Sequence, residues 1–416
     1  MKISSICKLF GFAFVASALV FPRAYGSQKL ILLIALLALL TLAGSAGRVF
    51  KITRPLIFFI GYAIIFAFAL VVGVIRGNSE EALLDGLRLG VLFPLMIAML
   101  WIFLSQYRYD LFLDRVVIFS AFGISLLVFV AFFQNIFGFQ ILPESFAEDN
   151  LLRVGLHDGY SQVVAHNIGS LFFVFGYLIY SVVSGKEKSQ KIVWFFALIF
   201  VLVASMMSGR RALQFSILAS PVFIFITSFL FGEIRVMRVR AVKWWLVLLA
   251  LMFLLLGYLF ANGYFYIDGF IERFSGVFED DGGARTSQAG SLLAGFADNP
   301  FFGSGIGGVT DVVRSETAPW VFELTYLQIL FNFGVVGSVA IFLIFLFEFR
   351  EIKLNSAKGA HVYRLADKSM ITGVLFLFFG AATNPYLGSF DFLLMIGAIP
   401  FVASIGSTRR RRVDGL

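Results

Sequence analysis

The sequence predicts an all-α protein that crosses a membrane many times. Of its 416 residues, 60% are hydrophobic and only 14% are charged, with a mean hydropathy of +0.92. Soluble domains are about 45–50% apolar and about 25% charged. The apolar residues also fall into runs, separated by charged turns, of about the length that crosses a bilayer as a helix. We therefore expect residues 1–416 to form a single integral membrane domain.

The apolar runs predict about twelve transmembrane helices. The first run follows Lys2 and Lys8 and is also compatible with a signal peptide. We favour a retained span, because no clear pattern of small residues for cleavage ends it. The expected spans are 9–21, 30–44, 55–75, 83–104, 111–133, 160–183, 191–207, 211–231, 244–261, 323–348, 369–383 and 386–405.

The positive charges predict the orientation of these spans. Most of the 33 lysines and arginines fall in the loops on one side if both termini are placed in the cytoplasm. The long loop 262–322 then lies outside. Orientation and contact with anionic membrane lipids explain the net charge of +8 better than a nucleic-acid partner does. One cysteine and three scattered histidines predict no metal site, and no motif calls for a cofactor.

Several arginines fall on the outer face, against the general bias. A planar guanidinium group suits phosphate or pyrophosphate, because it donates two hydrogen bonds and keeps its charge. The alternative for each arginine is an ordinary anchor to lipid headgroups. These arginines are Arg153, the pair Arg210 and Arg211 in a tight turn, and Arg285 and Arg314 in the long loop.

Arg88 is different, because it falls within a predicted span. An ionisable side chain there is expensive and is by default a candidate functional residue. The alternative is a structural ion pair with Asp85, one turn earlier on the same helix face.

The segment after Arg285 predicts a short helix followed by a turn. Residues 287–297 predict a short amphipathic helix, which Asn299-Pro300 ends, because proline disfavours the helical conformation of the preceding residue. Gly303 and Gly305 then allow a turn that approaches a ligand closely. No Gly-Lys-Ser/Thr follows, so this is not a Walker loop.

These motifs, taken together and in order over roughly residues 150–390, resemble the O-antigen polymerase and ligase family. The signature of that family contains an arginine followed by Asn-Pro-x-x-Gly-x-Gly. Ligases carry histidine at the position of Glu323. The glutamate in this chain therefore favours the polymerase branch. The motifs are Arg153-Val-Gly155, Ser208-Gly209-Arg210-Arg211-Ala212, Arg285 with Asn299-Pro300-Phe301-Phe302-Gly303-Ser304-Gly305, the stretch from Glu323 through Tyr326 to Gly334, and Asn384-Pro385-Tyr386.

The resemblance implies a metal-independent glycosyltransferase of the bacterial inner membrane, with a GT-C-like architecture and its active face in the periplasm. Its substrate would be an oligosaccharide linked to undecaprenyl pyrophosphate, polymerised into O-antigen for lipopolysaccharide or a similar surface polysaccharide with inversion at the anomeric centre. A protein that regulates chain length is a further partner that the resemblance implies.

The residues receive roles on this basis. Arg210 and Arg285 would stabilise the pyrophosphate leaving group, with Arg211, Arg153 and Arg314 as weaker candidates. Glu323 would be the general base for the acceptor hydroxyl. The alternative for Glu323 is a carboxylate that stabilises the start of a helix. The remaining candidates for substrate binding are Tyr326, Asn299, Gly303 and Gly305.

Two other functions remain open at this point. One is an O-antigen ligase, which would transfer finished glycan to the lipid A core. The glutamate at position 323, where ligases carry histidine, argues against it. A flippase or transporter of lipid-linked sugars would show repeats and charged residues near the bilayer midplane, where only Arg88 falls.

Overall fold

The computed structural model describes residues 3–22, 24–45, 54–94, 97–98, 100–101, 109–143, 152–157, 160–165, 167–185, 187–261, 283–357, 363–387 and 389–413. The chain forms two compact units, which are described separately below. The first comprises Met1–Ala43, Arg108–Phe278 and Gly359–Gly380. The second comprises Gly44–Tyr107, Glu279–Lys358 and Ala381–Leu416.

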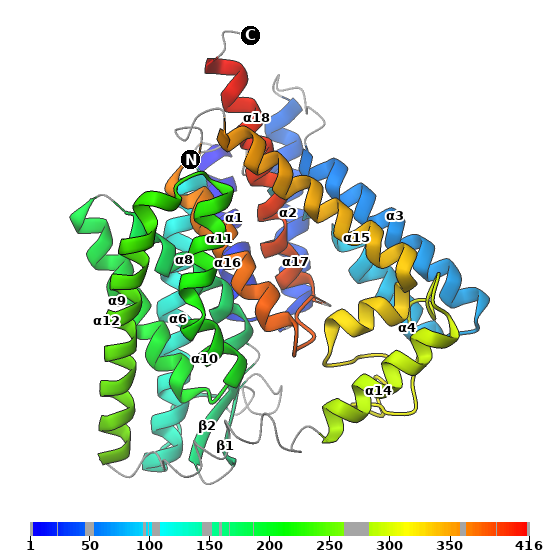
Figure 1. The fold of residues 1–416 in the computed structure, drawn as a ribbon, viewed down its shortest axis with the longest axis horizontal. Helices are drawn as coiled ribbons and strands as arrows, with labels where there is room; N and C mark the ends of the chain where they lie inside the picture. The colour runs from blue at the N-terminus through cyan, green and yellow to red at the C-terminus, as the bar shows by residue number, and fades with distance from the viewer. Residues whose placement is uncertain are drawn as a thin grey trace. The chain divides into compact units, whose positions relative to one another are not determined.

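The first unit is a bundle of helices with one short hairpin (Figure 1). The long helix α6 packs against α1, α8 and α9, and α12 packs against α11. Hydrogen bonds join helices inside this bundle. For example, the Tyr177 hydroxyl of α8 donates to Asp114 Oδ1 of α6 at 2.6 Å. The elements are α1 (Ile3–Val20), α2 (Gly26–Ser45), α6 (Tyr109–Phe137), β1 (Leu152–His157), β2 (Tyr160–Ala165), α8 (Ile168–Ser184), α9 (Lys188–Met207), α10 (Arg211–Leu218), α11 (Ser220–Leu230), α12 (Ile234–Ala261) and α16 (Leu365–Ala381).

The hairpin corrects one predicted span. Residues 160–183 were expected to form one helix, but 160–165 form β2, antiparallel to β1, and α8 starts only at Ile168. The segment 160–165 contains Tyr160, Val163 and Val164, which are residue types that favour strands. Its valines and alanine lie only two residues before the apolar run of α8, so hydropathy alone merges the two elements.

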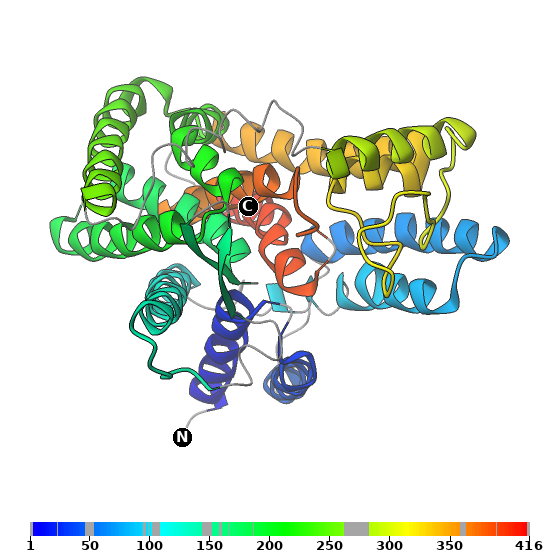
Figure 2. The same cartoon turned by 90° about the horizontal axis from the view of Figure 1, so that it is seen from below.

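The second unit contains residues 283–322 of the long loop and the last helices of the chain; residues 262–282 of that loop lie outside the described residues. Helix α15 packs against α3, α14 and α18, and α4 packs against α3 (Figures 1 and 2). The elements are α3 (Arg54–Ile75), α4 (Glu80–Leu87), the π-helix η1 (Arg88–Leu92), α14 (Gly283–Asp298), α15 (Thr325–Ala357), α17 (Phe390–Ile396) and α18 (Ala398–Val413).

Two boundaries in this unit differ from the expected spans. The span expected at 83–104 begins earlier, because Ser79 caps α4 by accepting a hydrogen bond from the Ala82 N–H at 3.3 Å. The span expected at 386–405 is divided between α17 and α18 at Gly397. Arg88, expected either to be functional or to pair with Asp85, does form that pair, with Nη1 3.6 Å from Asp85 Oδ1 and both side chains exposed.

The apolar helices support a multi-pass membrane protein. Within the described residues, four helices are long and apolar enough to cross a bilayer, or five if the bent pair α10–α11 is one span. About twelve spans were expected; the structure supports the membrane class, and the number twelve stays a prediction. The four are Arg54–Ile75, Phe112–Phe137, Lys188–Met207 and Thr325–Ala357.

The predicted span 211–231 is bent by 58° between α10 and α11. Pro221 stands in the first turn of α11. Proline has no N–H to continue the helical ladder, and its ring displaces the carbonyl group four residues earlier, so a helix bends or restarts there.

Helix α15 is also broken. Gly334 has φ 62° and ψ −169°, a backbone conformation that essentially only glycine adopts. The short part before Gly334 and the long part after it run in different directions (Figure 1). Glu323, which was expected to open a membrane span, therefore precedes this short first part of α15.

Candidate functional site

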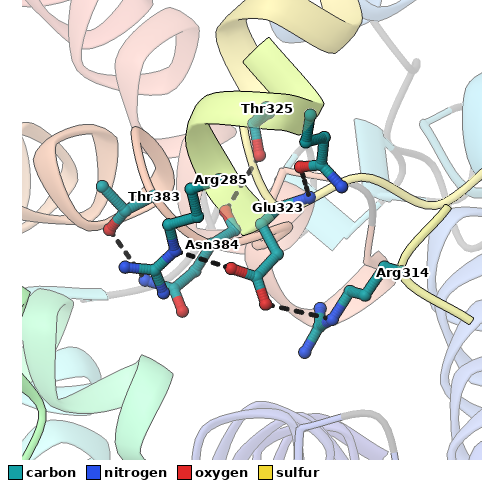
Figure 3. Close-up of polar contacts among 7 residues, drawn as sticks. Arg285, Arg314, Glu323, Thr325, Thr383 and Asn384 are labelled. Carbon is teal, nitrogen blue, oxygen red and sulfur yellow. Dashed lines mark hydrogen bonds and ion pairs between the residues drawn. The ribbon is translucent and has the colours of Figure 1, made fainter. Parts of the chain in front are cut away.

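A cluster of charged side chains in the described part of the long loop and its flanks is centred on Glu323. Arg285 Nε lies 2.7 Å from Glu323 Oε2, and Arg314 Nε lies 3.1 Å from Glu323 Oε1. Figure 3 shows both arginines pointing toward this one carboxylate. The side chains of Arg285 and Arg314 are 49% and 46% exposed, against 24% for Glu323, so a water-soluble anion can reach the arginines. We call these three residues the Arg–Glu–Arg cluster.

Each member of the cluster comes from a different local element. Arg285 lies in the first turn of α14, Arg314 in the irregular segment between α14 and α15, and Glu323 two residues before α15. Residues 287–297 were expected to form a short helix ended by Asn299-Pro300. That prediction is confirmed, with a start four residues earlier and an end at Asp298.

Hydrogen bonds fix the main chain around Glu323. Its N–H donates to Gln288 Oε1 at 3.0 Å, and Gln288 is a buried residue of α14, one turn from Arg285. Two residues further on, the Thr325 hydroxyl donates to the Asn384 carbonyl oxygen at 2.9 Å (Figure 3). The main chain on both sides of the carboxylate is thus tied to other segments of the same unit.

A buried apolar group packs next to the cluster. Leu292 of α14, Phe322 and Phe331 form a buried group, and Leu324 packs against it. The Phe322 and Phe331 rings meet edge to face with centroids 5.9 Å apart. Because Phe322 and Leu324 flank Glu323 and point into this group, the Glu323 side chain is directed away from it.

The Asn-Pro-Phe-Phe-Gly-Ser-Gly turn, residues 299–305, closes the break in α15. The carbonyl groups of Phe331 and Asn332 accept hydrogen bonds from Ser304 N–H at 2.8 Å and Gly305 N–H at 3.0 Å. On the other side of the break, Val335 N–H donates to the Pro300 carbonyl oxygen at 2.8 Å, and Val336 N–H to that of Phe301 at 3.1 Å. The turn therefore supplies the partners that an interrupted helix lacks.

Close packing explains why glycine occupies positions 303 and 305 of this turn. Both have positive φ, 71° for Gly303 and 76° for Gly305. A β-carbon at Gly303 would overlap with the carbonyl group of Asn332, and one at Gly305 would overlap with the main chain of Gly73 in α3. The close approach is to the chain's own backbone. Substrate binding by Gly303, Gly305 and Asn299 stays a prediction.

Asn78, in the turn between α3 and α4, holds the same turn from the opposite side. Its Nδ2 donates to the carbonyl oxygens of Ser304 at 3.1 Å and Ile306 at 2.8 Å. We expect Asn78→Ala to destabilise the purified protein by about 1–3 kcal/mol, because two hydrogen bonds are lost and two carbonyl groups lose a partner. Thermal unfolding in detergent measures this. Asn78→Asp, which keeps the shape but cannot donate, should be no more stable than the alanine variant. Wild-type unfolding temperatures for both would show that these bonds contribute nothing.

The remaining predicted arginines belong to the first unit. Arg210 lies immediately before α10 and Arg211 opens it, and both side chains are half-buried. Their turn is tight, because Gly209 has φ 61° and the Ser208 hydroxyl oxygen accepts a hydrogen bond from the Arg210 N–H at 3.3 Å. Arg153 lies in β1, opposite Val164. The structure thus brings Arg285, Arg314 and Glu323 together, and Tyr326 lies exposed in the first turn of α15, near Glu323 in the chain.

Three residues that support the site were not predicted from the sequence. Gln288 and Asn78 act through hydrogen bonds to segments 35 and more than 200 residues away, for which a single sequence carries no signal. Gly334 stands in an apolar run that reads as a continuous span. Its signal was the pair of neighbouring polar and glycine residues, Asn332 and Gly334, within that run.

The cluster offers guanidinium groups to an anion. Two arginines and one glutamate leave a net positive charge, and Arg285 adds to the positive end of α14, where anions are favoured. Among the described residues, no group of three or more His, Cys, Asp or Glu side chains could hold a metal ion. No model of a known protein family matches the chain, and no curated protein matches it.

Proposed function

We propose that the chain is a membrane glycosyltransferase that polymerises oligosaccharide units linked to undecaprenyl pyrophosphate. It would work on the periplasmic face of a bacterial inner membrane, with about twelve spans and both termini in the cytoplasm. The observation that carries the proposal is the Arg–Glu–Arg cluster, in which Arg285 and Arg314 converge from separate segments of the loop expected to lie outside.

This glycosyl transfer requires positive charge next to the pyrophosphate leaving group. An acceptor sugar hydroxyl oxygen attacks the anomeric carbon, and the bond from that carbon to the pyrophosphate oxygen breaks. Undecaprenyl pyrophosphate leaves with the electron pair, and the hydroxyl proton passes to a base or to water. Fixed guanidinium groups stabilise the charge that develops on the leaving oxygen. Arg285 and Arg314 are candidates for this role, and Arg210 keeps the role that was predicted for it from the sequence.

The position of the cluster suits a lipid-linked substrate. Arg285 and Arg314 flank the start of α15, whose long part after Gly334 belongs to a candidate membrane span. A pyrophosphate on a polyprenyl chain lies at the membrane surface, because its lipid tail stays in the bilayer. A guanidinium pair at the outer end of a span meets it there.

A genetic experiment tests this function. We would delete the gene in its host, restore it as wild type or as Arg210→Ala, and separate the surface glycans and lipid-linked glycans on a gel. We expect the deletion and the Arg210→Ala strain to carry single repeat units on the surface lipid with no ladder, while wild type restores the ladder. Accumulation of the variant protein is checked by immunoblot.

Other patterns would contradict a polymerase. Bare acceptor lipid, with long polymer retained on undecaprenyl pyrophosphate, would indicate a ligase. Single units held on the cytoplasmic leaflet would indicate a flippase. A normal ladder in the Arg210→Ala strain would show that Arg210 takes no part in the reaction.

A further inference from the structure

The carboxylate of Glu323 is shared between two arginines, one on each oxygen. Oε2 accepts a hydrogen bond from Arg285 Nε, and Oε1 forms an ion pair with Arg314, whose Nε is the nearest atom (Figure 3). A guanidinium group has five N–H donors in a fixed fork, of which Nε carries one. These contacts therefore leave the terminal Nη1 and Nη2 groups of both arginines outside the bonds to Glu323.

The main chain that carries the Glu323 carboxylate is fixed by contacts on both sides. The Glu323 N–H is bound by buried Gln288, which comes from the same helix as Arg285, and Thr325 is bound to Asn384. Phe322 and Leu324 pack into the buried apolar group on the other side. A carboxylate fixed in this way can hold the orientation of two flexible arginine side chains that are each about half exposed.

From this geometry we infer that Glu323 is a positioning residue, which bridges Arg285 and Arg314 so that their Nη groups act together on one pyrophosphate. This inference rests on the proposed function and changes one role in it, because Glu323 was predicted to be the general base. Each carboxylate oxygen already faces a guanidinium group, Oε2 through a hydrogen bond from Arg285 and Oε1 through the ion pair with Arg314, so neither is reserved for an acceptor hydroxyl.

The inference predicts the sign of a charge effect. If Glu323 merely lay near the anion site, removing its negative charge would strengthen anion binding by reducing repulsion. If Glu323 orients the two arginines, removing the carboxylate weakens binding, because the forks are no longer held together. A base would act on the acceptor hydroxyl and would not support pyrophosphate binding. The direction of the change therefore separates a positioning role from the other two.

The test is the binding of inorganic pyrophosphate to the purified full-length protein in detergent, at fixed ionic strength and without any acceptor glycan. Calorimetry gives Kd for wild type, Glu323→Gln, Glu323→Asp and Arg285→Ala. We expect Glu323→Gln to raise Kd about tenfold or more, the loss expected for one charge-assisted hydrogen bond. Glu323→Asp keeps a carboxylate and should recover part of the affinity. Arg285→Ala should raise Kd at least as much as Glu323→Gln does.

Glu316→Gln is the matched control, because it removes the same charge from an exposed residue two positions after Arg314. It should leave Kd unchanged or slightly lower. Glutamine at 323 has the shape of glutamate and leaves the main-chain bond to Gln288 in place, so the variant is expected to fold. Its unfolding temperature and elution from a sizing column check this.

Two results would overturn the inference, and they are distinguishable. Equal or tighter pyrophosphate binding by Glu323→Gln, with Arg285→Ala still weakened, would reject the bridging role alone. No pyrophosphate binding by the wild type would reject the proposed function together with the inference.

Discussion

Arg285→Ala is expected to abolish polymer formation while the protein still accumulates in the membrane. Loss of one preorganised donor to a developing negative charge lowers turnover by about 100- to 1,000-fold. Stability should change little, because ion pairs of exposed side chains contribute only about 0–1 kcal/mol and Arg285 is about half exposed. The surface-glycan ladder measures activity, and an immunoblot of the membrane fraction measures accumulation.

Two further variants sharpen this prediction. Arg76→Ala removes an exposed arginine from the turn after α3, in the same unit and on the face expected to lie outside, and should leave the ladder intact. Arg285→Lys keeps the charge but loses the planar fork, so it should recover only a small part of the activity. A normal ladder in Arg285→Ala cells would exclude this arginine from the reaction. Loss of the ladder in Arg76→Ala cells would show that any outer arginine matters.

Gly334→Ala is expected to destabilise the protein strongly. A side chain at φ 62° and ψ −169° costs about 1–3 kcal/mol from the backbone alone. The new β-carbon would also overlap with the carbonyl oxygen of Phe301, in the turn that closes the break. We expect the variant to unfold at a clearly lower temperature than wild type, or to fail to accumulate. Thermal unfolding of the detergent-solubilised protein measures this.

Gly290→Ala is the control for that measurement. Gly290 lies inside α14, and a β-carbon there meets no atom within 4 Å. Alanine in a helix interior is favoured over glycine by about 1 kcal/mol, so this variant should be as stable as wild type or slightly more stable. If Gly334→Ala matched Gly290→Ala, the break in α15 would not depend on glycine.

Local signals in the sequence predicted a good part of this structure. Asn299-Pro300 correctly placed the end of α14, because proline acts on the residue directly before it. The pairing of Arg88 with Asp85 follows from helical spacing alone. The membrane class follows from composition, because a lipid environment requires apolar helix surfaces over most of the chain.

Features that depend on distant contacts or on the backbone path were not predicted. Hydropathy reports how apolar a segment is and says nothing about its direction, so the break at Gly334 was read as part of one span. For the same reason, β2 was merged with α8. The meeting of Arg285 and Glu323 joins residues 38 positions apart, and Asn78 holds Ser304 and Ile306 from more than 200 residues earlier in the sequence. Arg314 was accordingly predicted as a weaker candidate than its position beside Glu323 suggests.

The most direct test is reconstitution of the purified protein in liposomes with the lipid-linked oligosaccharide extracted from the deletion strain. We predict products that are longer by whole repeat units, with one undecaprenyl pyrophosphate released for each new glycosidic bond and no release by Arg285→Ala. Unchanged oligosaccharide with no undecaprenyl pyrophosphate released, in liposomes where the protein is folded, would contradict the proposed polymerase.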